Sequence, residues 1–373
     1  MIRISQPIIS EEEIEALAMV LRSGMLIQGE RVKRFEQMLQ AYTGASHVLA
    51  VSSGTAALHI AVIAAEIGQG DAVLVPAFTF PATANVVELE GARTVMVDVE
   101  SGTYNMDPIK LEETIVGWAG KEALKAIIVV HEFGAPANMT AINDIAKRHG
   151  LLVIEDAACA LGTRHNGQHV GMLSDFGCFS WHPRKAITTG EGGAVIVKDE
   201  ELARTVQLLR NHGIDRNQDG KIDFLLAGLN YRLTEFQAAL GEKQLQHFDG
   251  WLKKREELVK KYQVQLSQIP GISLPEDLEG HTWQTFMVVL PDEVDQANVI
   301  KQMKLSNIET NIGANALHLL SYYKRKYGLH PHDFPVAKRL YEKGLAIPLH
   351  PLLQEEDIRY ITEELRKAIL HAG

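Results

Sequence analysis

Over roughly the first two-thirds of the chain, short apolar runs alternate with segments whose apolar residues recur at helical spacing. The runs are apolar at nearly every position, which is typical of strands that are buried on both faces. We therefore expect a mostly parallel sheet covered by helices on both sides, and such sheets bind ligands at the carboxyl ends of their strands. The predicted strands are residues 47–53, 71–78, 94–99, 124–134 and 151–158, and the predicted helices are residues 55–67, 80–91 and 139–150.

The last third of the chain has a different pattern, which predicts a second domain. Residues 234–268 predict one long helix or two joined helices, and the Pro/Gly-rich segment 270–280 follows them. Strand signal returns at residues 285–291, and helical signal returns near residues 355–371. The expected domains are a large one over residues 1–245 and a smaller α/β one over residues 250–373.

Composition excludes several classes of protein. The net charge of −10 argues against a nucleic-acid binder, which needs a basic face for phosphate contacts. The two cysteines, Cys159 and Cys178, form neither a redox pair nor a disulfide framework. The N-terminus lacks the pattern of a signal peptide, and no apolar run is long enough to span a membrane. We expect a cytoplasmic protein without nucleic-acid or membrane partners.

The segment SSGTAAL at residues 52–58 stands at a predicted strand-to-helix turn. Gly54 allows a tight turn, and the amides of Thr55 and Ala56 would open a helix, whose free N–H groups bind phosphate. The alternative is an ordinary turn in which the threonine caps the helix. No Gly-Lys-Ser/Thr follows, so the segment is not a Walker-type nucleotide loop.

Two further side chains suit a single cofactor. Asp156 ends a very apolar strand, where a carboxylate needs a partner such as a protonated pyridine nitrogen, although helix capping and metal ligation are alternatives. Lys185 precedes a Gly-rich turn into another apolar strand, and lysine is the residue that forms Schiff bases, although most lysines lie on the surface. A phosphate turn, a strand-end aspartate and a later lysine occur in the order that a pyridoxal-phosphate (PLP) site needs.

Three segments mimic metal sites. Residues 215–226 match the first half of a calcium loop, but Leu226 stands where the bidentate Glu is needed, and we expect a hairpin instead. The HPHD segment at 330–333 lacks a spaced partner cluster. The HEF segment at 131–133 lacks the second His of a zinc-protease helix. We expect no metal site.

The chain resembles the DegT-type sugar aminotransferases, which have the aspartate aminotransferase fold, fold type I of PLP enzymes. The resemblance covers nearly the whole chain and is most specific in FSWHPRKAITTGEGGAV (179–195) and GLNYRLTEFQAAL (228–240). It also includes SGMLIQGERVKRFE (23–36), VSSGTAALHIA (51–61), VIEDAACALG (153–162) and LAIPLHPLL (345–353).

The resemblance implies a role for each site residue. Lys185 would bind PLP as a Schiff base and then move the proton between substrate and cofactor carbons, while Asp156 would pair with the pyridine nitrogen. Cys159 stands near the phenolic oxygen of the cofactor, where the family usually has Gln or His, and a thiol is a weaker donor. The other implied contacts are Gly54, Thr55 and Ser180 at the phosphate, Phe80 on the ring face, and Asn230 at the phosphate of the neighbouring subunit.

The implied reaction moves an amino group from glutamate to a keto-sugar carried on a nucleotide, in a homodimer with shared active sites. A cyclitol aminotransferase acting on a keto-inositol is the alternative within the family. The related sugar dehydratases have His at the lysine position, so Lys185 argues against that chemistry. A non-catalytic sensor with the same fold would tolerate loss of Lys185 or Asp156, and both are present.

Overall fold

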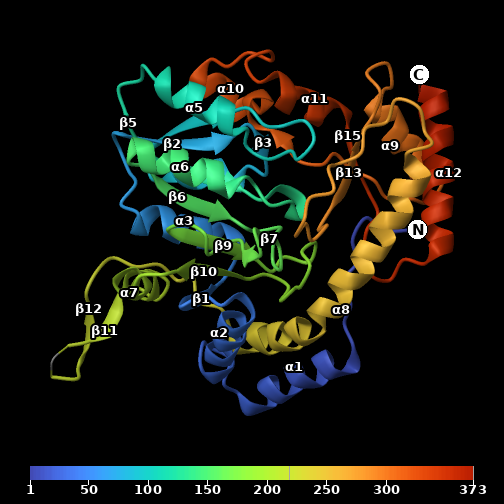
Figure 1. The fold of residues 1–373 in the computed structure, drawn as a ribbon. Helices are drawn as coiled ribbons and strands as arrows, with labels where there is room; N and C mark the ends of the chain where they lie inside the picture. The colour runs from blue at the N-terminus through green and yellow to red at the C-terminus, as the bar shows by residue number, and fades with distance from the viewer. Residues whose placement is uncertain (218, 373) are drawn as a thin grey trace.

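The computed structural model describes residues 1–217 and 219–372, and its centre is a seven-stranded sheet with helices packed on both faces (Figure 1). The strand order is β1-β10-β9-β6-β5-β2-β4. All five strands predicted from the apolar runs lie in this sheet. The strands are β1 (His47–Val51), β2 (Asp71–Pro76), β4 (Arg93–Val97), β5 (Ala123–Val130), β6 (Leu152–Asp156), β9 (Phe176–Ser180) and β10 (Gly193–Val197).

The sheet is mostly parallel, as predicted, and this confirms the expected fold class. Strands β4, β2, β5, β6 and β9 pair with their neighbours in parallel. Strand β10 runs antiparallel to both β9 and β1, and the apolar pattern did not distinguish these pairs. The loop over residues 181–192 joins β9 to β10 without a crossover helix, which parallel strands would require.

Alternate residues of the strands contact different helices, which explains why the runs are apolar at nearly every position. Ile128 of β5 packs in a core with helices α3 (Gly54–Ala64), α4 (Ala82–Leu89) and α7 (Glu200–Leu209). Its neighbours Ile127 and Val129 pack with helices on the other face. Those helices are α5 (Pro108–Val116) and α6 (Met139–His149).

One continuous helix, α8 (Glu235–Leu266), occupies the segment for which one or two helices were expected. Helices α1 (Glu11–Ser23) and α2 (Glu30–Thr43) pack on α8, as does α12 (Glu355–Ala372) (Figure 1). The expected domain division at residues 245–250 falls within α8 and stays a prediction.

A separate apolar core includes the second half of α8. It contains Tyr262 of α8, strands β13 (Phe286–Val289) and β15 (Gly344–Ile347), which pair antiparallel, and buried residues of α12. The remaining elements are β3 (Phe78–Thr79), β7 (Arg164–His165), β8 (Gln168–His169), β11 (Ile214–Arg216), β12 (Ile222–Phe224), α9 (Gln296–Leu305), β14 (Asn315–Ala316), α10 (Ser321–Tyr327), α11 (Pro335–Lys343) and two single 3-10 turns at Glu132–Gly134 and Leu317–Leu319.

The segment that resembles half of a calcium loop forms the expected hairpin. Ile214 of β11 faces Phe224 of β12, and Asp215 faces Asp223. Residue 218, within this segment, lies outside the described residues. Over residues 1–217 and 219–372 we found no group of three or more His, Cys, Asp or Glu side chains that could hold a metal ion. Within the same ranges, no helix is long and apolar enough to cross a membrane.

Candidate active site

The strands place most of the predicted site residues along one edge of the sheet. Because β1, β5, β6 and β9 run in the same direction, their carboxyl ends lie together. Gly54 follows β1, Asp156 ends β6 and Ser180 ends β9. Lys185 lies in the loop that leaves the same end of β9. This is the edge at which a sheet of this kind binds ligands.

Asp156 is a buried carboxylate held in a fixed orientation. The Thr83 hydroxyl donates a hydrogen bond to its Oδ2 at 2.8 Å, and the Ala158 main-chain N–H donates to its Oδ1 at 3.2 Å. Burial raises the pKa of Asp156 above its usual range, and the hydrogen bonds and the Lys185 cation act in the opposite direction. A cationic ligand group at Asp156 would therefore be stabilised.

Lys185 points into the same cluster. Its Nζ donates a hydrogen bond to Cys159 Sγ at 3.0 Å. Burial disfavours the ammonium, but the hydrogen bond to Cys159 and the nearby Asp156 carboxylate favour it, and the pKa of Lys185 lies above its usual value. Burial also raises the pKa of Cys159, so the thiol is neutral near pH 7. The structure thus brings together the predicted lysine, aspartate and cysteine.

Gly54 and Ser180 are in direct contact, although they are far apart in the sequence. A Cβ on Gly54 would lie 2.7 Å from Ser180 Cβ, so only glycine lets the start of α3 approach the end of β9. The alternative in which Thr55 caps α3 is wrong, because the cap is Ser53, whose hydroxyl accepts from the Ala56 N–H at 3.0 Å. The Ala56 amide is therefore not free, and the exposed Thr55 remains for a phosphate.

Phe80 and Asn230 lie outside this buried cluster. Phe80 stands between β3 and α4 with its side chain 69% exposed, and the Asn230 side chain is also exposed. The neighbouring Tyr231 carbonyl accepts from the Ser52 N–H at 2.9 Å, which places Asn230 near the Gly54 turn. The single chain does not bring these two side chains into contact with Lys185 within the part that the structure describes.

Sequence reasoning missed two residues of the site. Thr83 was not predicted, because its contact with Asp156 joins residues 73 positions apart. Glu132 was considered only as part of a metal motif, yet it is 4% exposed and both Asp156 and Lys185 shift its pKa. The signal that could have found Glu132 is an acid just beyond the end of an apolar strand, which is similar to the pattern that identified Asp156.

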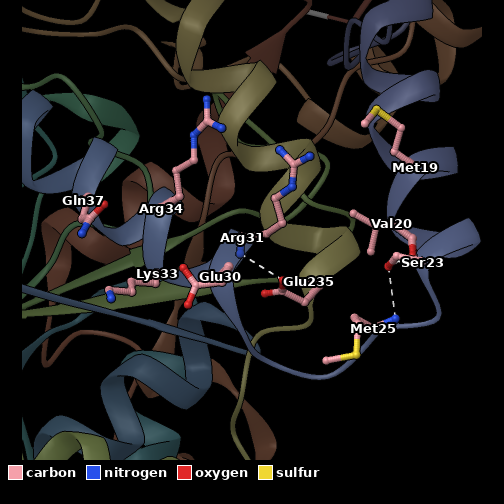
Figure 2. Close-up of a pocket in the computed structure, with 10 residues that line it drawn as sticks. All are labelled: Met19, Val20, Ser23, Met25, Glu30, Arg31, Lys33, Arg34, Gln37 and Glu235. Atoms are coloured by element: carbon pink, nitrogen blue, oxygen red, sulfur yellow. Dashed lines mark hydrogen bonds between the residues drawn. The ribbon is translucent and has the colours of Figure 1, made fainter.

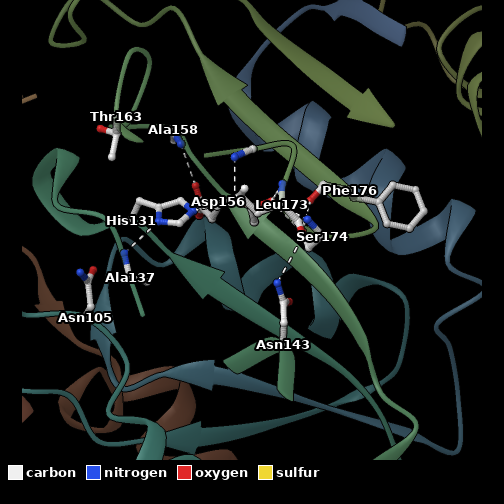
Figure 3. Close-up of polar contacts among 12 residues, drawn as sticks. Asn105, His131, Ala137, Asn143, Asp156, Ala158, Thr163, Leu173, Ser174 and Phe176 are labelled. Carbon is white, nitrogen blue, oxygen red and sulfur yellow. Dashed lines mark hydrogen bonds and ion pairs between the residues drawn. The ribbon is translucent and has the colours of Figure 1, made fainter. Parts of the chain in front are cut away.

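His131 and Glu155 form a buried pair that supports this edge, and Figure 3 shows His131 beside Ala137 and Asp156. The Ala137 N–H donates to His131 Nδ1 at 3.1 Å, so His131 Nε2 carries the proton that it donates to Glu155 at 3.0 Å. Burial opposes the charge of Glu155, but hydrogen bonds from His131, the Gly171 amide and Ser174 hold its pKa below the usual range. We infer that this pair has a structural role next to Asp156.

A cavity of about 540 Å³ lies elsewhere, between α1, α2 and the start of α8 (Figure 2). Two of its charged residues are paired: Glu235 accepts from the Arg31 N–H at 2.9 Å, and the Arg31 side chain binds Glu242 at 3.0 Å. None of the predicted site residues lines this cavity. It is therefore not a candidate for the predicted chemistry.

The donor set at the sheet edge fits PLP. The Lys185 amine lies in a cluster with the buried Asp156 carboxylate. The N-terminus of α3 contacts Ser180 at Gly54, where any side chain would collide with Ser180. The free carboxyl oxygen of Glu132, Oε2, has no partner among the described residues, which leaves an acceptor or donor site for a ligand.

The chain is similar to known proteins over nearly its whole length. A family model described as the DegT/DnrJ/EryC1/StrS aminotransferase family matches residues 7–366. The spore coat polysaccharide biosynthesis protein SpsC of Bacillus subtilis (strain 168) is 35% identical over 379 residues, which cover 98% of this chain and 96% of SpsC. Spr1654 from Streptococcus pneumoniae in its PLP form has a TM-score of 0.91 and 28% identity, with 99% of each chain covered. Helicobacter pylori PseC, an aminotransferase involved in the biosynthesis of pseudoaminic acid, has a TM-score of 0.92 and 25% identity, with 99% of each chain covered.

Proposed function

This chain belongs to the DegT/DnrJ/EryC1/StrS aminotransferase family, and from that membership we propose that it transfers an amino group from glutamate to a keto-sugar carried on a nucleotide, with PLP bound to Lys185 as a Schiff base. The enzyme is an aminotransferase, and its cofactor is PLP. The observation that carries the site assignment is the Lys185 amine in a buried cluster with Asp156.

PLP supplies an electron sink that makes a proton on the substrate carbon acidic. Asp156 holds a proton on the ring nitrogen, because a buried carboxylate stabilises an adjacent cation. Thr83 and Ala158 keep that carboxylate in place. Lys185 Nζ then moves the proton as general base and acid, because the amine lies within the cluster. Gly54, Thr55 and Ser180 bind the phosphate, and Phe80 covers the ring.

Support for a sugar substrate comes from the relatives. SpsC is named for spore coat polysaccharide biosynthesis, and PseC for the biosynthesis of pseudoaminic acid. The glutamate donor and the nucleotide carrier are inferred from the family resemblance alone. We also propose a homodimer in which Asn230 serves the neighbouring site, domains at residues 1–245 and 250–373, and a cytoplasmic location.

The first test is the visible absorption of the purified protein with PLP, for wild type, Lys185→Ala and Lys198→Ala. Wild type should gain a visible band that glutamate removes and a keto-sugar restores. Lys185→Ala should lose covalent attachment of PLP, shown by borohydride reduction and peptide mass spectrometry. Its kcat should fall by about 10²–10⁴-fold or more, because proton transfer is lost. Lys198 is exposed at the far end of β10 and serves as the matched control.

The outcomes separate the parts of the proposal. If wild type binds no PLP, the assignment of the cofactor site to Lys185 and Asp156 fails. If PLP binds but glutamate leaves the band unchanged, the proposed donor is wrong. Nucleotide-linked keto-sugars compared with a keto-inositol as acceptors would then test the sugar assignment, and a preference for the keto-inositol would contradict it.

A further inference from the structure

Glu132 is a buried acid at the Lys185 site that has no role in the proposed function above. It lies just after β5, separated from the strand by His131, and begins the 3-10 turn Glu132–Gly134; the residue is 4% exposed. Its main-chain N–H donates to Asn105 Oδ1 at 2.8 Å, which holds the backbone. Within residues 1–217 and 219–372, however, its side-chain Oε2 has no hydrogen-bond partner. A buried polar atom without a partner is unfavourable unless a ligand completes it.

The turn that carries Glu132 is tied to the segment that carries Lys185. Phe133 has φ of 56°, a left-handed conformation that non-glycine residues rarely adopt. The Phe133 carbonyl accepts from the Gln284 N–H at 2.9 Å, and Gln284 Nε2 donates to the Arg184 carbonyl at 2.7 Å. Strained conformations of this kind persist where surrounding contacts hold them, and they are frequent at functional sites.

Four groups from neighbouring elements act on the Glu132 carboxyl: Asp156, Lys185, the Cys159 thiol and the Thr79 hydroxyl. The adjacent His131 ring is occupied by Glu155 and Ala137. Burial, followed by Asp156, raises the pKa of Glu132 to about 8, although Lys185, the Phe133 N–H and the Thr79 hydroxyl act in the opposite direction. At neutral pH the carboxyl group therefore keeps its proton and can donate a hydrogen bond.

We propose that Glu132 is a further cofactor-contacting residue, whose carboxyl group binds the phenolic oxygen of PLP on the side of the ring that faces Cys159. This inference rests on the proposed function, because it takes Lys185 as the residue that bonds to the aldehyde carbon of PLP. In PLP the phenolic oxygen and the aldehyde are on adjacent ring carbons, and the phosphate arm is on the other side of the aldehyde. Glu132 and Cys159 both interact with Lys185, whereas Gly54 and Ser180 form the phosphate turn.

The proposal explains why an acid stands at this position. The Cys159 thiol is a weak donor, and it already accepts a hydrogen bond from Lys185. A neutral carboxylic acid is a strong O–H donor, and hydrogen bonds to an ionised oxygen are about twice as strong as those between neutral groups. Glu132 thus supplies the strong donor that Cys159 does not.

The experiment compares Glu132→Gln and Glu132→Leu with wild type, in the absence of any substrate. Two quantities are measured: the dissociation constant of PLP, and the pH at which the visible absorption of the protein-bound cofactor changes. Glu242→Gln is the matched control, because Glu242 is also a buried glutamate with an unpartnered oxygen among the described residues, but it pairs with Arg31 at the α2–α8 contact. Thermal unfolding of each cofactor-free variant establishes that it is folded.

The expected results differ between the two substitutions. Glu132→Gln keeps a donor of the same size, an N–H group, so its PLP affinity should stay within about threefold of wild type. A change of that size is smaller than the loss of one hydrogen bond would cause. Glu132→Leu loses the donor, so PLP affinity should fall about 10–100-fold, the loss expected for one hydrogen bond to a charged group. The pH of the absorption change should rise in Glu132→Leu, since the donor stabilises the form with a negative phenolic oxygen.

Other outcomes would overturn the proposal. If Gln and Leu shift the absorption change alike, Glu132 acts as a charged partner of Lys185 and not as a donor. If Glu132→Leu binds PLP as tightly as wild type and Glu242→Gln, Glu132 does not contact the cofactor. Both results leave the proposed function intact, whereas failure of wild type to bind PLP would contradict the proposed function itself.

Discussion

Lys185 shares its surroundings with three acidic side chains, and they cannot all be ionised in so buried a place. Asp156 accepts hydrogen bonds from Thr83 and Ala158, which stabilise its charged form. Burial is the first cause of a raised pKa in all three groups, Asp156 included. The consistent assignment is one cation, Lys185, balanced by one anion, Asp156. Glu132 and Cys159 are then neutral groups, which a cofactor can contact without meeting further charge.

The raised pKa of Glu132 makes stability depend on pH. The carboxyl titrates at about 8 in the folded protein and near its ordinary 4.5 when unfolded. The folded state therefore binds the extra proton between these values, and the free energy of unfolding should fall as pH rises through this window. The glutamine in Glu132→Gln cannot titrate. Between about pH 5 and 9, the free energy of unfolding of the cofactor-free variant should therefore fall by a few kcal/mol less than that of wild type. Urea unfolding across this range measures the difference, and parallel pH profiles for the two proteins would disprove it.

The start of helix α3 and the end of strand β9 together form the proposed phosphate turn. The Ser53 cap orders the first turn of α3, and Gly54 lets that turn meet Ser180. Apolar residues of α3 pack in the same core as Phe176 and Cys178 of β9, so the helix cannot easily move away. The geometry of the phosphate turn therefore depends on glycine at position 54, which has no Cβ.

Gly54→Ala should consequently damage cofactor binding more than folding. The new Cβ would lie 2.7 Å from Ser180 Cβ, so α3 or β9 must shift. Overpacking of this kind costs about 1–3 kcal/mol of stability, and a shift of about 1 Å at a ligand site can cost about 100-fold in function. PLP titration and thermal unfolding measure the two effects. Gly250→Ala on α8 is the control, because its Cβ would meet nothing within 4 Å. Equal PLP affinity in Gly54→Ala and Gly250→Ala would mean that this turn does not bind the phosphate.

At the scale of the whole molecule, local patterns were enough to predict the sheet and the order of its main elements. The strand containing Ile127 and Ile128 could be predicted, because both faces of the sheet are covered and every position is apolar. Asp156 and Lys185 could be predicted as a pair, because a strand-end acid and a lysine before a Gly-rich turn are local signals. The antiparallel place of β10 and the contact of Thr83 with Asp156 depend on tertiary packing, which no local pattern encodes.

The hairpin formed by β11 and β12 projects from the body of the molecule (Figure 1). Ile222, Phe224 and Leu225 on this segment are more than half exposed, at 65%, 63% and 54% of each residue. Exposed apolar groups of this kind often mark contacts with another protein. Asn230, also exposed, follows the hairpin in the sequence. These features agree with the proposed homodimer. In it, a second copy of the chain covers the hairpin, and Asn230 reaches the phosphate of the cofactor that this second copy binds.

Shared sites in a homodimer predict complementation between two inactive variants. Lys185→Ala keeps Asn230, and Asn230→Ala keeps Lys185, so a mixed dimer has one site in which both residues are intact. Co-expression at equal levels should restore about a quarter of the wild-type number of complete sites, because half of the dimers are mixed and each has one such site. Activity and PLP content of the purified mixture, compared with each variant alone, measure the recovery. If Asn230 serves the site of its own chain, mixing restores nothing, because each mixed dimer then has one site without Lys185 and one without Asn230.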